Sequence, residues 1–321
     1  MSSVVARSRA VLVRAWRIDA ALTASALLML VALTVCAVGL SFDPRVLLGA
    51  PLWLKPAKFA VSIAVYCVTL IWLFNFIPAF ERTRRVVGWT TAGAMCIEMG
   101  IIGAQAARGT TSHFNVSSPL NIALFAIMGT AILVQTLSTV AVAVALFRQR
   151  FADRPLGWAL RLGLLISIAG ASLAGLMTRP TQAQLVELRA GQVLVAGAHT
   201  VGAPDGGPGI PVTGWSRGHG DLRVAHFMGL HALQVLPLLA LALRRTRRTE
   251  EQRQWLVLSL AGSYAGLVGI LLWQALRGQP PFAPDPSTLA ALLGWLTLTV
   301  AATWCSLAGR ALPSGSVASL S

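Results

Sequence analysis

Long apolar stretches alternate with short polar gaps along the whole chain, and this alternation predicts the fold. A helix needs about 20 apolar residues to cross the hydrocarbon of a bilayer. Eight stretches meet this length, covering residues 20–40, 59–80, 86–107, 119–147, 157–178, 222–243, 255–276 and 288–309. The pattern predicts an all-α integral membrane bundle of eight transmembrane helices.

The gaps divide the chain into one membrane domain and a tail. The transmembrane domain is predicted over residues 1–312, and residues 313–321 are expected to form a disordered tail because small polar residues bury little apolar surface. The longest gap, residues 179–221, is predicted to be an external loop. Within it, residues 181–190 have the pattern of a short amphipathic surface helix.

Lysine and arginine gather in alternate gaps, and this bias predicts the orientation. The N-terminus, the gaps 81–85, 148–161 and 244–253, and the C-terminus hold 17 of the 26 Lys and Arg residues. Short cytoplasmic loops are enriched in these residues, so both termini are expected in the cytoplasm. We expect the protein in the cytoplasmic (inner) membrane of a bacterium, with the lipid bilayer as its main partner.

The composition excludes a soluble protein and a nucleic-acid-binding protein. Only 12% of the residues are charged, about half of what a soluble domain carries. The net charge is +15, but the cations form no basic face with interleaved aromatic residues, so nucleic acid is not expected as a partner. The four cysteines lie inside apolar stretches without metal-binding spacing and are expected to be buried small hydrophobes.

Polar residues inside the predicted spans indicate a site, because such side chains normally face a bundle interior or a cavity. At about 100° per residue, polar residues fall on single faces of four spans. Glu98 and His231 each lie about 14 Å from the outer end of their helix, so they can pair near the midplane. The alternative is a buried pair that only fixes helix packing. The candidate polar site comprises Lys58, Glu98, Gln105, Arg108, His113, Asn115, Asp205, Arg223, His226, His231 and Gln234.

All five histidines lie near the predicted outer face. Neutral imidazole is a common ligand of divalent metals, and two histidines from different helices can hold a b-type haem. His113, His199 and His226 are the candidate ligands, although no pair has the local spacing of a strong metal motif. Four cations near this face either extend to the membrane interface or form an anion-binding mouth: Lys55, Lys58, Arg108 and Arg223.

Four motifs carry a resemblance: residues 55–59 (Lys-Pro-Ala-Lys-Phe), residues 105–109 (Gln-Ala-Ala-Arg-Gly), residues 112–115 (Ser-His-Phe-Asn) and residues 220–234, which run from Gly-Asp-Leu-Arg to a final Leu-Gln. Together they are similar to an uncharacterised family of bacterial multi-pass membrane proteins. The resemblance spans about residues 50–240 and implies the membrane fold. It brings no assigned activity with it.

Three hypotheses about function follow from the clustered ionisable groups. The first is a protein with an outward-facing His/Asp/Arg-lined site that binds haem or a divalent metal. The second is a metal-dependent membrane enzyme that acts on a lipid-like substrate. The third is a proton-coupled transporter that uses Glu98 and His231. Whether the protein is an enzyme, and which small molecule it binds, the residues alone leave open.

Overall fold

The computed structural model describes residues 2–308, so the predicted tail and the last residues of the predicted domain lie outside the described part. It confirms the all-α membrane bundle, because eight described helices are long and apolar enough to cross a bilayer. These helices are α2 (Ala20–Phe42), α3 (Leu54–Phe74), α4 (Glu81–Ala107), α5 (Pro119–Arg148), α6 (Arg154–Ser172), α9 (Leu222–Leu243), α10 (Glu250–Leu276) and α11 (Pro286–Leu307). A short helix, α7 (Ala174–Met177), extends the span that α6 begins.

Helix ends follow capping chemistry more closely than hydropathy. Asp19, Ser118, Asp153, Asp221 and Asp285 each accept a backbone N–H at the start of the following helix, as N-cap residues do. The predicted start of the second span at residue 59 is wrong, because α3 begins at Leu54 and ends at Phe74. Lys55 and Lys58 therefore both lie in the first turns of the helix.

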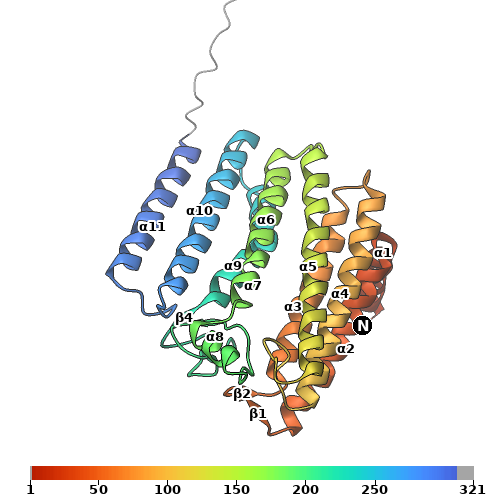
Figure 1. The fold of residues 1–321 in the computed structure, drawn as a ribbon. Helices are drawn as coiled ribbons and strands as arrows, with labels where there is room; N and C mark the ends of the chain where they lie inside the picture. Colours follow the sequence, from red (N-terminus) through yellow and green to blue (C-terminus); the bar gives the residue numbers. More distant parts are fainter. Residues whose placement is uncertain (1, 309–321) are drawn as a thin grey trace, which may run out of the picture.

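The bundle has two ends of different character (Figure 1). The long-loop end carries residues 43–53, 108–118, 178–221 and 277–285, and the short-loop end carries residues 75–80, 149–153 and 244–249. The long-loop end also holds two small antiparallel ribbons, β1 (Val46–Leu47) with β2 (Ala50–Pro51) and β3 (Thr200–Val201) with β4 (Gly220–Asp221).

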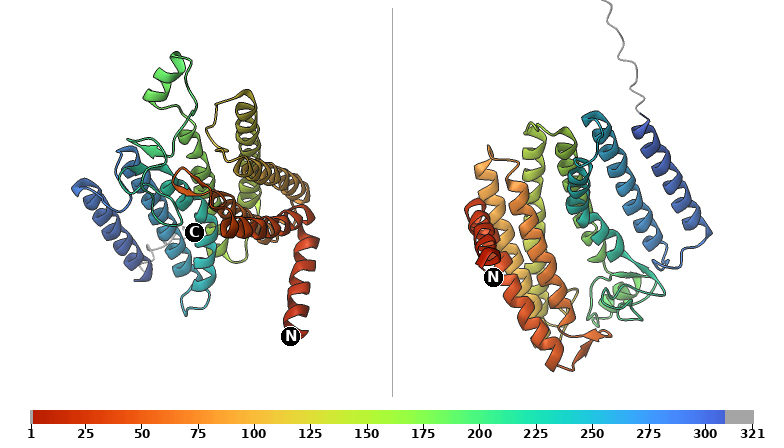
Figure 2. Two further views of the ribbon diagram at one scale, coloured as in Figure 1. Left: turned by 90° about the horizontal axis from the view of Figure 1, so that it is seen from below. Right: turned by 180° about the vertical axis from the view of Figure 1, so that it is seen from behind.

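The spans form two helix groups, α2–α5 and α6–α11, which lie side by side in both ribbon views (Figures 1 and 2). Within the second group α6 and α9 pack very closely, since a Cβ added to Gly229 would lie 2.6 Å from the Cα of Gly170. Small residues permit such close backbone approach in membranes. The principal helix contact between the groups is that of α5 with α6.

A shared apolar core joins the two groups toward the short-loop end. Its fully buried side chains include Phe74 of α3, Leu146 of α5, Leu160 of α6 and Leu236 of α9. A much smaller cluster at the long-loop end contains Phe114, Met177, Leu222 and Ala275. The groups are therefore held together by apolar packing at one end and by loop contacts at the other.

Two helices lie outside the bundle of spans. A helix is confirmed at the predicted place in the long loop, α8 (Gln182–Arg189), which starts with a capping box at Thr181; its amphipathic character stays a prediction. The helix α1 (Ser2–Ile18) precedes the first span and projects sideways from the bundle in the view along its axis (Figure 2). The predicted pattern of spans did not include it.

Candidate functional site

Three segments at the long-loop end are tied together by backbone hydrogen bonds. The amide of Ala196 donates to Phe114 (2.8 Å), and that of Val116 donates to Leu194 (3.0 Å). The amide of Leu222 donates to the carbonyl of His199 (3.0 Å), which joins the long loop to the start of α9. These ties bring the loop after α4, the long loop and α9 together beside the first turns of α3.

Lys55 and His113 form the first part of the site. The Lys55 Nζ lies 3.1 Å from His113 Nδ1, and the Ser112 Oγ lies 3.0 Å from the same nitrogen. An ammonium group can only donate, so Nδ1 accepts and the imidazole proton lies on Nε2. Burial lowers the pKa of His113 well below its ordinary value of 6.5, and the charge of Lys55 lowers it further. His113 is therefore neutral at physiological pH.

His199 and Asp205 form the second part. The Asp205 carboxylate accepts from His199 Nδ1 (2.8 Å) and from the backbone amides of His199 and Thr200. Burial lowers the pKa of His199, although the hydrogen bond to Asp205 opposes that effect, and the charges of Arg223 and Lys55 lower it further. Burial alone would raise the pKa of Asp205, but its hydrogen bonds with His199 hold it below the ordinary value. Because Nδ1 donates to Asp205, the His199 Nε2 is an acceptor, and no contact among the described residues engages it, so it can act as a base.

The Phe114 ring lies near both imidazoles. Its ring centroid lies 4.8 Å from that of His199 and 6.2 Å from that of His113. Its backbone has a φ of 60°, which is a costly conformation for a bulky residue. Gly197 leaves room for the Phe114 ring, because a Cβ at position 197 would lie 2.6 Å from that ring. A residue with a strained backbone thus holds its aromatic ring next to two ionisable groups.

Lys58 and Arg223 donate to the carbonyls of two neighbouring residues in the long loop. Lys58 Nζ donates to the carbonyl of Thr213 (3.1 Å), and Arg223 Nη2 donates to that of Gly214 (2.6 Å). Arg223 also forms an ion pair with the fully buried carboxylate of Asp221 (2.6 Å). Within the described residues neither Lys55 nor Lys58 forms an ion pair.

Three of the predicted site residues instead stabilise the loop after α4. Gln105 donates to Asn121 (3.0 Å) and accepts from Arg108 (2.5 Å). Asn115 donates to the Thr110 hydroxyl and the Thr111 carbonyl, both at 3.0 Å. Because these amide groups are engaged within the chain, we interpret them as positioning residues for His113.

Glu98 and His231 occupy different surroundings. Glu98 is only 3% exposed, and its Oε2 has no hydrogen-bond partner among the described residues. Lys55 is close enough to Glu98 for their charges to attract each other. His231 is exposed on α9, and among the contacts of the described residues none joins it to Glu98. The structure therefore brings Glu98 toward Lys55 and not toward His231.

The remaining predicted residues lie on α9. His226 Nδ1 lies 2.8 Å from the carbonyl of Gly170, to which it donates, and this bond ties α9 to α6. The Gln234 amide meets the Thr69 hydroxyl of α3 at 3.3 Å. His226 and Gln234 thus link α9 to a different neighbour on each side.

The histidines do not fit the predicted metal or haem centre. Within residues 2–308 no three His, Cys, Asp or Glu side chains gather in a way that could hold a metal ion. A bis-histidine haem requires the macrocycle to lie between two imidazoles. For His113 and His199, the Phe114 ring packs against both. His226 is turned toward α6.

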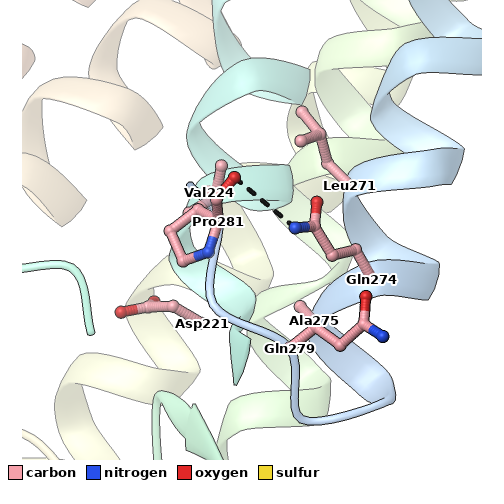
Figure 3. A pocket seen from close by; sticks show the side chains of 7 residues that line it. All are labelled: Asp221, Val224, Leu271, Gln274, Ala275, Gln279 and Pro281. Atoms are coloured by element: carbon pink, nitrogen blue, oxygen red, sulfur yellow. Dashed lines mark hydrogen bonds between the residues drawn. The ribbon is translucent and has the colours of Figure 1, made fainter. Parts of the chain in front are cut away.

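A narrow crevice lies between α9 and α10 at the same end (Figure 3). Its empty volume is about 160 Å³, part of which is open solvent. The Gln274 amide reaches the Pro281 carbonyl (3.4 Å) across it. Asp221, the only charged residue among those that line it, is already paired with Arg223. The crevice is lined by Asp221, Val224, Leu271, Gln274, Ala275, Gln279 and Pro281.

The chemistry of this end therefore centres on Lys55, Lys58, His113, His199 and Arg223. Lys55 is predicted among the cations of an anion-binding mouth but not in the candidate polar site, although its spacing of three residues from Lys58 places both on one side of a helix. The chain matches no protein-family model, no curated protein and no solved structure.

Proposed function

We propose that this multi-pass membrane protein binds a ligand with an anionic group, such as a phosphate, at its outer face. The binding groups are Lys55, Lys58 and Arg223, and the neutral imidazoles of His113 and His199 complete the site. The proposal rests on the burial and the pairing of Lys55 and Lys58. Both are partly buried, and neither is paired with a carboxylate among the described residues.

Partly buried cations that no carboxylate contacts support this function, because removing a charge from water without a directly paired counter-ion is costly. Lys55 donates only to a neutral imidazole and Lys58 only to a carbonyl. Both also lie in the first turns of α3, where the helix dipole further favours a negative charge. A bound anion would compensate the charges of Lys55 and Lys58 and the positive end of the α3 dipole together.

Thermal unfolding of the purified full chain with inorganic phosphate, against sodium chloride at matched ionic strength, tests the proposal. A ligand that binds only the folded state raises the melting temperature. We expect phosphate to raise it in the wild type, Lys55→Gln to lose the shift, and Arg179→Gln to keep it. Arg179 is the matched control, because it is an exposed cation at the same end of the bundle. Equal shifts in all three proteins would contradict the proposal.

Glu98, whose buried Oε2 has no hydrogen-bond partner among the described residues, favours a second candidate function, proton-coupled transport of the same anion. Ionisable groups inside a membrane span commonly carry protons in transporters. In proteoliposomes, an imposed pH gradient would then drive uptake of labelled phosphate. Glu98→Gln should abolish that uptake, whereas Glu187→Gln, which removes an exposed carboxylate of α8, should not. Uptake that persists in Glu98→Gln would exclude this function.

A further inference from the structure

Helix α1 is attached to the bundle at its last turn. Of the α1 side chains that the structure describes, Ala15 and Ile18 pack against the apolar core, and the others are exposed. An isolated helix of this length is marginal in water, because most helical stability in proteins comes from the packing of one face. The helix therefore needs a second surface, outside the bundle, to cover its remaining length.

One side of α1 is apolar. Val5, Leu12 and Trp16 lie within about 40° of one another around the helix, and we call them the apolar face. They are 65%, 42% and 50% exposed. Leucine and tryptophan on one side of a helix, with arginine on the other, are typical of helices that lie flat in the membrane interface.

The other side of α1 is cationic. Arg7, Arg14 and Arg17 lie about 140–160° from Leu12 around the helix, and we call them the arginine face. All three are exposed, and none forms an ion pair among the described residues. Because α1 contains no Asp or Glu, this face is complementary to a negatively charged surface.

The junction of α1 and α2 lies at the level where α4 changes from charged to apolar. A Cβ added to Gly88 of α4 would collide with the carboxylate of Asp19, the residue between α1 and α2. Residues 81–85 of α4 include one Glu and three Arg, whereas residues 86–97 carry no charged side chain. From this level α1 runs across the bundle axis (Figure 2), as a helix in the plane of the membrane does.

Exposed tryptophans mark the same level on other helices. Trp89 follows Gly88 on α4, and Trp255 and Trp304 lie within about two turns of the short-loop ends of α10 and α11. These three side chains are 68%, 52% and 72% exposed. Tryptophan is enriched at membrane–water interfaces, so this belt indicates that Trp16 and the rest of α1 lie at such an interface.

We propose that α1 lies flat in the membrane interface at the short-loop end, where its arginine face binds the phosphate groups of anionic phospholipids. The apolar face then contacts the acyl chains, and the long arginine side chains extend to the headgroups beside the helix. The ligand is a lipid surface and not a free anion, because the apolar face needs acyl chains. The inference is independent of the proposed anion site, which uses other residues at the opposite end of the bundle.

An anionic membrane surface fits α1 better than a second copy of the chain does. Two α1 helices that packed through their apolar faces would leave both arginine faces without a negative partner. Contact between two arginine faces would be repulsive, because like charges at close range repel. An anionic lipid surface satisfies both faces of the helix together.

Hydrogen–deuterium exchange of the full chain, read by mass spectrometry, tests the proposal in nanodiscs. One set contains phosphatidylcholine alone, and the other also contains phosphatidylglycerol. An amide exchanges when its local structure opens, so lipid contact slows exchange over residues 2–18. We expect α1 to exchange at least about tenfold more slowly with phosphatidylglycerol, since each arginine near an anionic surface contributes roughly a fivefold effect. The exposed loop of residues 244–249 should exchange alike in both sets.

Two matched pairs of variants separate the two faces. A triple Arg→Gln variant of the arginine face should lose the effect of phosphatidylglycerol. The same change at Arg245, Arg247 and Arg248, which are exposed at the same end of the bundle, should keep it. Leu12→Gln should speed exchange of α1 in both sets, whereas Ala10→Gln should not, because Ala10 lies about 160° from Leu12 around the helix.

Three outcomes would overturn the proposal. Equal exchange of α1 in both sets of nanodiscs would show that anionic lipid does not hold the helix. A triple variant of the arginine face that still responds to phosphatidylglycerol would remove the arginines from the contact. Exchange that Leu12→Gln leaves unchanged would show that the apolar face does not enter the bilayer.

Discussion

At the scale of single residues, the two loop histidines His113 and His199 are held in their neutral forms. Their pKa values lie below the ordinary 6.5, mainly because of burial. In an unfolded chain the same groups titrate near 6.5. Proton uptake at lower pH therefore favours the unfolded state, and the folded state loses stability as the pH falls.

We predict that the melting temperature of the detergent-solubilised protein is constant above about pH 7 and falls below about pH 6.5. Each histidine contributes up to about 1.4 kcal/mol per pH unit. Replacing both, as His113→Asn with His199→Asn, should flatten the profile between about pH 6.5 and pH 5. A double variant that keeps the wild-type slope would show that other groups cause the pH dependence.

Asp205 gives a second prediction at this scale. Its carboxylate accepts three hydrogen bonds, and an Asn side chain presents an NH₂ group to at least one of the donors. We expect Asp205→Asn to lower the free energy of unfolding by about 1–3 kcal/mol, as for an unsatisfied buried polar group. Glu187→Gln, in the exposed α8 of the same loop, is the control and should be neutral in a chemical denaturation series.

The sequence predicted which loops carry the chemistry but not which side chains meet. His199 and Asp205 are six residues apart, a separation that a turn can close. Lys55 and His113 are 58 residues apart, and their contact depends on how α3 packs against the loop after α4. Helical periodicity placed His231 with other polar groups, because it gives angles around one helix and no information about the neighbouring helix.

At the scale of elements, the close crossing of α6 and α9 holds the second helix group together. The two backbones approach through Gly170 and Gly229, and His226 donates to the Gly170 carbonyl at the same place. Hydropathy predicted the spans of both helices. It could not predict this pairing, since glycines that contact a neighbour and glycines that face lipid look alike in a single sequence.

We predict that Gly229→Ala lowers the free energy of unfolding by about 1–3 kcal/mol, because the added Cβ overpacks the crossing. Gly262→Ala on α10 is the matched control, since nothing lies within 4 Å of a Cβ at that position. Thermal unfolding in detergent measures both. A Gly229→Ala protein as stable as the control would show that α6 and α9 can move apart at this crossing without losing free energy of unfolding.

At the scale of the whole molecule, the orientation in the membrane remains a prediction from the arginine bias. Arg217 and Thr246 are exposed at opposite ends of the bundle. In intact spheroplasts, a membrane-impermeant maleimide should label Arg217→Cys, and it should label Thr246→Cys only after lysis. The wild type, whose four cysteines lie within the spans, gives the background. The reverse pattern would place the site in the cytoplasm.

The division of the spans into two helix groups also affects how the protein is made. The first group, α2–α5, precedes the second in the chain, and proteins tend to fold in order as they leave the ribosome. Lys55, Lys58 and His113 precede the second group in the chain, whereas His199 and Arg223 follow with it. A nascent chain that stops near residue 150 thus contains only three of the five proposed binding groups. The site can be completed only late in biosynthesis, when the second half of the chain has entered the bilayer.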